Sequence, residues 1–320
     1  MKRLGLVGTG AWGHRYIESV ERRKDCRFVA VVRRSADLDA SFPHLTIVRD
    51  WRDLLELVRR GELDGIVVAT TPANQAEIAL EAARQSIPIL VEKPLGLSPQ
   101  APREVRAVLE AKERPAPVLV NAIHLWSHAY VELKARVRSA GGPSRVATIR
   151  TRGANRGPFR SWPSLYDYGV HDVSMCLDLL EPSAPVRVLG ARKQAKPIGI
   201  HRAECYQAGL EIAGTRIDFS VDNGSELKVR RFAVELVTGR TLVYDDVELP
   251  ARKLLDSGEP VSLPNELPLD AVLSDFLGRI ERFQTEQLSR ADVAQSVVLA
   301  ERALTVLQDI DGAADVALDD

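Results

Sequence analysis

The stretch Gly8-Thr9-Gly10-Ala11-Trp12-Gly13 stands between an apolar run at residues 3–7 and a helical pattern at residues 13–22. In a GxGxxG motif the first glycine permits a tight turn, the second lets the backbone approach a pyrophosphate, and the third lets helix and strand pack closely. The phosphates then lie at the N-terminus of the helix. Because an ordinary glycine-rich turn would look the same, the meaning of the motif depends on the chain around it.

Residues 3–120 carry the pattern that such a motif requires, because short β-rich runs alternate with helical stretches. The predicted strands are residues 3–7, 28–32, 65–69, 88–91 and 118–120, and the predicted helices are residues 13–22, 50–60, 74–85 and 101–112. Alternation of this kind builds a doubly wound parallel sheet. We therefore expect an α/β domain of Rossmann type, able to bind NAD(P), over residues 1–121.

The second half of the chain has a different pattern, with a long series of predicted strands between residues 145 and 247 in which apolar and polar residues alternate. Gly-Gly, Ala-Gly, Asn-Gly and Thr-Gly pairs separate these strands and predict a largely antiparallel sheet. Helices are predicted at residues 128–139, 167–180, 271–286 and 292–307, and a Pro-rich loop at residues 250–268. We expect an α+β domain over residues 122–320, with the closing helices able to pack back on the first domain.

Composition and charge restrict the class of partner. The 320 residues include 43 basic and 44 acidic side chains, so no overall positive field exists to attract nucleic acid or an anionic membrane. The first residues lack a signal-peptide core, no apolar run reaches the length of a membrane span, and the three cysteines show no metal or disulfide spacing. We expect a cytoplasmic protein with free thiols, long enough for two domains.

Arg33, Arg34 and Ser35 follow the predicted strand at residues 28–32. NAD enzymes usually place an Asp or Glu at this point against the ribose hydroxyls, whereas guanidinium groups suit a 2′-phosphate by charge and by forked geometry. We therefore predict a preference for NADP(H), with NAD(H) as the second possibility. A solvated loop is the alternative, since arginine is common throughout this chain.

Polar residues follow two further predicted strands, at the edge of the sheet where a Rossmann crevice forms. Thr70-Thr71-Pro72 ends one strand with Gln75 shortly after it, and Glu92-Lys93-Pro94 ends the next strand. A lysine at this edge can hydrogen-bond a substrate oxygen and stabilise a developing alkoxide. Taken alone, Lys93 could equally be a surface residue in a turn.

Asp167-Tyr168-Gly169-Val170-His171-Asp172 is the densest polar cluster of the second half and leads into an apolar run at residues 173–180. If the helix begins near Tyr168, Asp167 is its N-cap and His171 projects from its first turn. A neutral imidazole near the nicotinamide would be a fitting general acid or base. Because a lone histidine is more often structural, this interpretation depends on the other motifs.

A metal site has little support, and none is predicted. His124 and His128 stand four residues apart but lack the glutamate of an HExxH zinc motif. Aromatic and basic side chains in the second half could line a sugar site, or could serve packing and loops. The candidates for substrate contact are His124, Trp126, Arg160, Trp162, Tyr168 and Asp172.

Together these motifs resemble the glucose-fructose oxidoreductase / inositol dehydrogenase / MocA family (Gfo/Idh/MocA) over nearly the whole chain. The resemblance rests on the glycine motif at residues 8–13, Thr71-Pro72 before a helix, Glu92-Lys93-Pro94 ending a strand, and the Asp-x-Gly-x-His run at residues 167–171. It implies that Lys93 and His171 are the catalytic pair, with Asp167 as an alternative proton carrier. The expected cofactor-binding residues are Gly8, Thr9, Gly10, Ala11, Trp12, Gly13, Arg33, Arg34, Ser35, Thr70, Thr71, Pro72, Gln75, Glu92, Lys93 and Asn121.

The resemblance also implies that the second domain binds substrate and presents an open-faced sheet, through which the chain forms a homodimer or homotetramer. Two positions depart from the family pattern. The family frequently has Asp three residues after the catalytic His, where this chain has Ser174, although Asp172 could substitute. It often has His three residues after the proline of Thr-Pro, where this chain has Gln75. These departures concern substrate orientation and the shape of the cofactor loop.

The function that the resemblance implies is hydride transfer to or from a hydroxyl or ketone carbon of a sugar, cyclitol or nucleotide sugar. A preference for NADP(H) would favour the reducing direction. Two alternatives stay open: a reductase of an imine or another unsaturated bond, and a non-catalytic protein that senses NADP. The scaffold alone does not separate them. The presence of both Lys93 and His171 favours an enzyme of C–OH chemistry.

Overall fold

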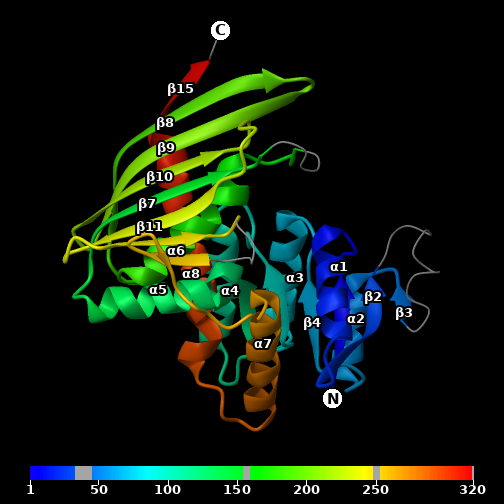
Figure 1. Cartoon of the computed structure of the whole chain (residues 1–320). Helices are drawn as coiled ribbons and strands as arrows, with labels where there is room; N and C mark the ends of the chain where they lie inside the picture. The colour runs from blue at the N-terminus through cyan, green and yellow to red at the C-terminus, as the bar shows by residue number, and fades with distance from the viewer. Residues whose placement is uncertain (33–44, 154–158, 248–252, 319–320) are drawn as a thin grey trace. The chain divides into compact units, whose positions relative to one another are not determined.

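The computed structural model describes residues 1–32, 45–153, 159–247 and 253–318 of the chain (Figure 1). These residues form two compact units. The first comprises Met1–Ala122 and Leu269–Glu301, and the second comprises Ile123–Pro268 and Arg302–Asp320. The closing helices are thus divided between both units.

A six-stranded sheet forms the centre of the first unit, with the order β3-β2-β1-β4-β5-β6 and every neighbouring pair parallel. The order reverses between β1 and β4, which is the switch point of a doubly wound fold, so the predicted Rossmann sheet is confirmed. β3 was not predicted, because its three residues are too few to show a period in the sequence. The strands are β1 Lys2–Val7, β2 Cys26–Val32, β3 Thr46–Val48, β4 Gly65–Val68, β5 Ile89–Glu92 and β6 Val118–Asn121.

The core of this unit explains why its strands read as continuous apolar runs. β4, β5 and β6 are buried along their whole length, as parallel strands covered on both faces usually are. Gly65 begins β4 where a Cβ would lie 2.9 Å from the side chain of Ile280, so the helix that carries Ile280 packs directly on the sheet. The helices are α1 Ala11–Glu21, α2 Trp51–Arg59, α3 Pro72–Arg84, α4 Gln100–Ala111 and α7 Pro268–Gln284.

A nine-stranded sheet forms the second unit, with the order β14-β13-β12-β11-β7-β10-β9-β8-β15. All neighbouring pairs are antiparallel except β7 with β10 and β8 with β15, so the prediction of a largely antiparallel sheet is confirmed. Its strands are β7 Pro143–Thr151, β8 Val186–Ile198, β9 His201–Ile212, β10 Thr215–Asp222, β11 Arg230–Leu236, β12 Thr241–Asp245, β13 Lys253–Asp256, β14 Glu259–Pro260 and β15 Ala314–Leu318.

The prediction of a loop over residues 250–268 is wrong for part of its length, because β13 and β14 form a small hairpin there. Ser257 and Gly258 make the turn with positive φ angles of 52° and 91°. Both strands are too short to show alternation in the sequence. The other elements of this unit are η2 Ile123–Trp126, α5 His128–Ser139, η3 Leu165–Gly169, α6 Val170–Leu179 and the last part of α8 Arg290–Ala313.

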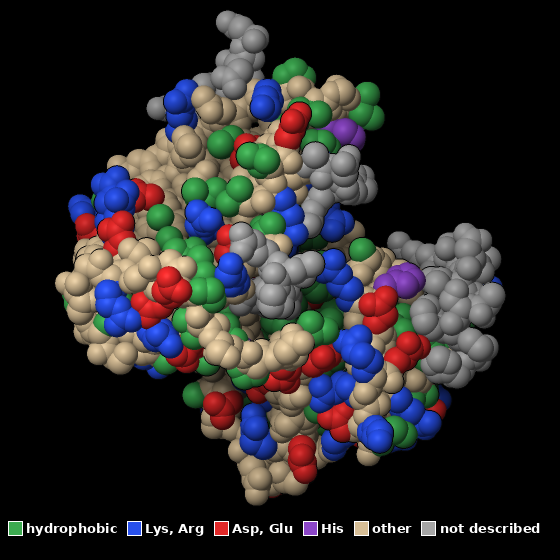
Figure 2. Space-filling view, viewed as in Figure 1, with side chains coloured by type: hydrophobic (Ala, Val, Ile, Leu, Met, Phe, Trp, Pro, Cys, Tyr) green, Lys and Arg blue, Asp and Glu red, His purple; other side chains and the backbone are tan. Residues whose placement is uncertain are grey.

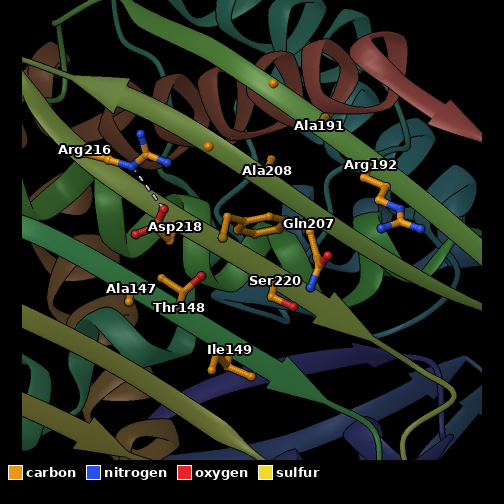
Figure 3. A pocket seen from close by; sticks show the side chains of 13 residues that line it. Ala147, Thr148, Ile149, Ala191, Arg192, Gln207, Ala208, Arg216, Asp218 and Ser220 are labelled. Atoms are coloured by element: carbon orange, nitrogen blue, oxygen red, sulfur yellow. Dashed lines mark hydrogen bonds and ion pairs between the residues drawn. The ribbon is translucent and has the colours of Figure 1, made fainter.

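One face of the second sheet is covered and the other is open. On β10 the side chains of Ile217, Phe219 and Val221 are buried, whereas the alternate residues are exposed or half-buried. Figure 1 shows α5, α6 and α8 on one side of this sheet. An open hollow of about 550 Å³ lies over β7, β8, β9 and β10, and its lining includes Ile149, Arg192 and the ion pair of Arg216 with Asp218 (Figure 3).

The surface carries charges of both signs. Figure 2 shows Lys and Arg side chains interspersed with Asp and Glu across the visible face, rather than gathered by sign. In the described part of the chain, no helix has the length and apolar character that crossing a bilayer would require.

Candidate active site

The turn after β1 requires glycine at the first and last positions of its motif. Gly8 has a φ of +97°, and a Cβ there would lie 2.3 Å from the carbonyl oxygen of Ala69. A Cβ on Gly13 would lie 2.0 Å from the carbonyl oxygen of Gly8, so a side chain at either position would displace backbone. A Cβ on Gly10, the N-cap of α1, would meet nothing within 4 Å. Open backbone at a helix N-terminus fits the pyrophosphate of a dinucleotide.

The register of the sheet brings the other motifs of the first unit to the same edge. Val7 pairs with Val68, Val68 pairs with Val91, and Glu92 pairs with Asn121. The glycine turn, the stretch 69–72, Lys93 and Asn121 therefore all stand at the carboxyl ends of neighbouring strands. This is the edge at which doubly wound sheets bind their ligands.

A buried hydrogen-bonded network, made of Tyr16, Glu92 and Asn121, lies at this edge. The hydroxyl of Tyr16 donates to Oε1 of Glu92 at 2.7 Å. Nδ2 of Asn121 donates to the same oxygen at 2.7 Å and lies 2.8 Å from the Tyr16 hydroxyl. The three residues are at most 4% exposed. The network thus ties α1, which begins at the glycine turn, to the ends of β5 and β6.

Electrostatics keeps the Tyr16 hydroxyl protonated. Burial, together with the adjacent Glu92, raises the pKa of Tyr16 well above its usual range, so its hydroxyl acts as a donor. Burial also raises the pKa of the Glu92 carboxyl, while the hydrogen bonds from Tyr16 and Asn121 act in the opposite direction because they favour its charged form. Oδ1 of Asn121 is buried and has no hydrogen-bond partner among the described residues.

Gln75 secures the turn that carries Lys93. Its Nε2 donates to the carbonyl oxygen of Glu92 at 2.7 Å and to that of Pro94 at 2.8 Å, one on each side of the lysine. The side chain is buried, so both amide hydrogens are used inside the protein. The Lys93-Pro94 peptide is cis, and Lys93 is half-buried. This geometry supports a role for Gln75 in shaping the turn rather than in touching a cofactor.

Replacing Tyr16 by Phe tests how much the network contributes to stability. Tyr16→Phe removes one donor from the buried Glu92 carboxyl and keeps the ring, so we expect it to lower the free energy of unfolding by about 1–3 kcal/mol. Urea denaturation measures this loss. Combined with Glu92→Gln, it should cost less than the sum of the two single variants, because they disturb the same contact. A Tyr16→Phe variant as stable as the wild type would contradict the role given to the network.

The remaining cofactor candidates of the first unit differ in exposure. Gly10, Ala11 and Thr71 are exposed, Thr9, Trp12 and Thr70 are half-buried, and Pro72 is buried in the first turn of α3. The guanidinium of Arg15 lies 4.7 Å from the centre of the Trp12 ring. Arg33, Arg34 and Ser35, on which the prediction of an NADP preference rests, lie outside the described residues.

In the second unit, the helical segment that carries His171 begins earlier than predicted. A π-helical turn, η3, precedes α6, and Ser164 occupies the N-cap position of η3. The prediction that Asp167 caps this helix is therefore wrong, because Asp167 lies within η3, with its Oδ2 3.9 Å from Nε of Arg160. A Cβ on Gly169 would lie 2.9 Å from the side chains of Leu307 and Phe219, which explains the glycine between Asp167 and His171.

The predicted substrate residues of this unit fall into two groups. Trp126, Trp162 and Tyr168 are half-buried and Arg160 is exposed, with the Arg160 guanidinium 5.4 Å from the centre of the Trp162 ring. His124 and Asp172 are buried, at 5% and 1% exposure. The half-buried His171 lies against His124, with ring centroids 4.8 Å apart.

A buried ion pair of Arg150 with Asp172 was not predicted from the sequence. Nε of Arg150 donates to both carboxylate oxygens of Asp172, at 3.2 and 3.0 Å, and Nη2 donates to Oδ1 at 2.8 Å. Both side chains are at most 4% exposed. The sequence offered one signal for this ion pair: Arg150 lies at every-second-residue spacing from Val146 and Thr148, on the buried face of β7. The carboxylate of Asp172 is thus engaged inside the protein, beside His171.

No three His, Cys, Asp or Glu side chains come together as a metal-binding group in the parts of the chain that the structure describes. The groups with proton-transfer chemistry at the positions predicted from the sequence are Lys93 in the first unit, and His171 and Asp167 in the second.

The chain is similar in sequence to oxidoreductases. Residues 2–121 match the model of the Gfo/Idh/MocA oxidoreductase family, described by its NAD-binding Rossmann fold. The chain is 25% identical over 205 residues to an inositol 2-dehydrogenase of Paracoccus denitrificans (strain Pd 1222), covering 61% of this chain and 59% of that protein. It is 33% identical over 107 residues to an inositol 2-dehydrogenase of Rubrobacter xylanophilus, covering 32% of this chain and 30% of that protein. These matches span less than two thirds of the relatives' own length.

Solved structures resemble nearly the whole chain. A provisionally assigned oxidoreductase from Magnetospirillum magnetotacticum MS-1 is 27% identical, with a TM-score of 0.78 over 98% of this chain and 99% of that chain. KijD10, a 3-ketoreductase from Actinomadura kijaniata in complex with TDP-benzene and NADP, is 18% identical, with a TM-score of 0.78 over 100% of this chain and 99% of that chain. At that identity the second likeness supports the fold alone.

Proposed function

We propose that this chain, whose residues 2–121 match the model of the Gfo/Idh/MocA oxidoreductase family, is an NADP(H)-dependent enzyme acting on a sugar-like substrate. It would transfer a hydride to or from a hydroxyl or ketone carbon. The observation that carries the proposal is the network of Tyr16, Glu92 and Asn121, which holds the Lys93 turn at the same sheet edge as the glycine turn.

The chemistry follows from the groups at that edge. Bound NADP(H) supplies or accepts the hydride. The glycine turn would hold its pyrophosphate, and Oδ1 of Asn121, which is buried without a donor among the described residues, can accept a hydrogen bond from a carboxamide N–H. Lys93 donates to the substrate oxygen and stabilises the negative charge that grows on it during reduction. His171 gives the proton to that oxygen in reduction and takes it in oxidation, with Asp167 as the alternative group.

The substrate side of the proposal rests on the second unit. The proposed contacts with a sugar are the half-buried Trp126, Trp162 and Tyr168 and the exposed Arg160, which combine ring faces with a forked donor suited to hydroxyl or phosphate oxygens. The proposed role of Asp172 is to hold the start of α6 through Arg150, since its carboxylate already accepts three hydrogen bonds.

The proposed preference for NADP(H) rests on Arg33 and Arg34, which follow β2. Arg33→Asp should weaken NADPH binding by about tenfold or more, because a charge-assisted hydrogen bond to the 2′-phosphate becomes a repulsion. Binding of NADH should change little. Isothermal titration with both cofactors measures the effect. The control is Arg27→Asp, which makes the same charge change at an exposed position of β2. A variant still selective for NADPH would show that another group binds the phosphate.

A substrate panel tests the proposed activity. The purified chain is incubated with NADPH and keto sugars or TDP-linked 3-keto sugars, and with NADP⁺ and myo-inositol, while nicotinamide absorbance is followed. We expect turnover of at least one polyol, sugar or nucleotide sugar. Turnover confined to imines would favour the alternative reductase, and NADPH binding without turnover of any substrate would favour a cofactor-sensing protein.

We also propose that copies of this chain associate through the open face of the second sheet. Ile149 and Leu189 on this side of the unit are 44% and 41% exposed, and small residues such as Ala147, Gly190 and Gly209 line the hollow beside them. A dimer or a tetramer would remove these apolar side chains from water.

A further inference from the structure

Tyr244, His124 and His171 form a row of contacting rings in the second unit. Nδ1 of His124 lies 2.9 Å from the hydroxyl of Tyr244, and the two ring centroids are 5.8 Å apart. The ring of His124 then meets that of His171 with centroids 4.8 Å apart and planes at 82°. The three side chains come from β12, η2 and α6, which are distant in the sequence.

Burial decreases along this row. Tyr244 is 1% exposed and His124 is 5% exposed, whereas His171 is half-buried. A substrate molecule arriving from solvent would therefore meet His171 and find little of His124 to touch. This argues against the interpretation of His124 as a substrate contact and leaves its ring with a different task.

That task follows from the freedom of a histidine side chain. Rotation about the Cβ–Cγ bond of histidine has broad minima, so an imidazole on a helix does not hold one orientation by its own rotamer preference. An edge-to-face neighbour restricts this rotation, because turning either ring by a large angle brings the rings into collision. His124 can restrict His171 in this way because Tyr244 hydrogen-bonds His124 from the other side.

The backbone of His171 is held separately. Asp172, the next residue, forms the buried ion pair with Arg150 of β7, with hydrogen bonds of 2.8 to 3.2 Å. The ion pair anchors the first turn of α6 to β7, and the row of rings restricts the orientation of the imidazole. A change at Tyr244 should therefore reach His171 through the ring of His124.

We propose that His124 and Tyr244 are positioning residues that fix the orientation of the His171 imidazole for proton transfer. This inference rests on the proposed function, in which His171 carries the proton. A fixed orientation matters because proton transfer requires a hydrogen bond of correct length and direction to the substrate oxygen.

The first test reads the coupling without any substrate. The chain has six histidines, so the full-length protein labelled at histidine ¹³Cε1 gives few signals, which single His variants assign. Tyr244→Phe should move the His171 signal, even though the hydrogen bond of Tyr244 is to His124 and not to His171. Tyr206→Phe is the matched control, because it removes a buried hydroxyl of the same unit that bonds Asp311 instead, and it should leave the His171 signal in place.

The route through His124 is tested in the same experiment. In a His124→Phe background, which keeps a ring of similar breadth but no group for Tyr244 to bond, adding Tyr244→Phe should leave the His171 signal unchanged. A His171 signal that ignores Tyr244→Phe in the wild type, or that still moves in the His124→Phe background, overturns the proposal.

The second test uses turnover of the substrate that is most active in the panel above. His124→Phe should lower kcat about tenfold and leave KM near its wild-type value, because a misdirected imidazole impairs proton transfer and not binding. A raised KM at unchanged kcat would instead make His124 a substrate contact and overturn the proposal. Failure of the proposed function gives a different result. His171→Ala would then keep wild-type turnover, while in the protein that retains His171 the Tyr244→Phe substitution would still move the His171 signal.

Discussion

Lys93→Ala should lower kcat by about 10³-fold, because it removes the donor that stabilises negative charge on the substrate oxygen. The affinity for NADPH should stay at its wild-type value. Gln75 bonds the backbone carbonyls of Glu92 and Pro94 on either side of Lys93, and the variant leaves both contacts in place, so the turn should keep its shape. Steady-state kinetics with the best substrate of the panel, together with NADPH titration, measures both quantities.

Lys112→Ala is the matched control for this variant. Lys112 is half-buried at the C-cap of α4, the helix that leads into the beginning of β6, so it stands at the opposite edge of the sheet. Its replacement should leave kcat unchanged. If Lys93→Ala turned over substrate as fast as the wild type, Lys93 would have no catalytic role and the proposed mechanism would fall.

His171→Ala is expected to lower kcat by about 10²-fold or more, the usual contribution of a positioned general acid or base. The loss should be largest under conditions in which proton transfer limits the rate. Because the variant removes a titrating group from the proton step, the pH profile of kcat should also lose one of its two limbs. Thermal unfolding should change less than activity, because Asp172 and Arg150 still hold the start of α6.

His128→Ala serves as the control for His171. His128 lies at the start of α5 and pairs with Glu266 near the surface at 2.9 Å, a contact that contributes little to stability. Both variants lose an imidazole from the same unit, and only that of His171 should affect turnover. Equal activities in the two would assign the proton step to Asp167 or to another group.

The sequence sufficed for features that depend on neighbouring residues. The glycine motif, the strand ends at Thr70 and Glu92, and the alternation of the second sheet are local patterns, and the structure confirms the two fold classes that they predict. The short strands β3, β13 and β14 were not found, because two to four residues are too few to show a period. The prediction that Asp167 begins a helix was wrong, because the local sequence pattern does not indicate that a π-helical turn precedes α6.

The partners of the site residues could not be predicted, because they depend on contacts between distant parts of the chain. Tyr16 is 76 residues from Glu92, and His124 is 120 residues from Tyr244. The sequence identifies Asp172 as a polar residue next to His171, but only the fold shows that its carboxylate forms an ion pair with Arg150. A sequence therefore identifies which residues carry chemistry more readily than it identifies which residues support them.

We propose that the first unit binds a nicotinamide cofactor and prefers its phosphorylated form. Titration of the purified chain with NADPH and with NADH, followed by nicotinamide fluorescence, tests it most directly. We predict saturable binding of NADPH and binding of NADH that is weaker by about tenfold or more, the difference that one charge-assisted contact to the 2′-phosphate supplies. Equal or tighter binding of NADH would contradict the preference, and the absence of binding by either cofactor would contradict the proposed function itself.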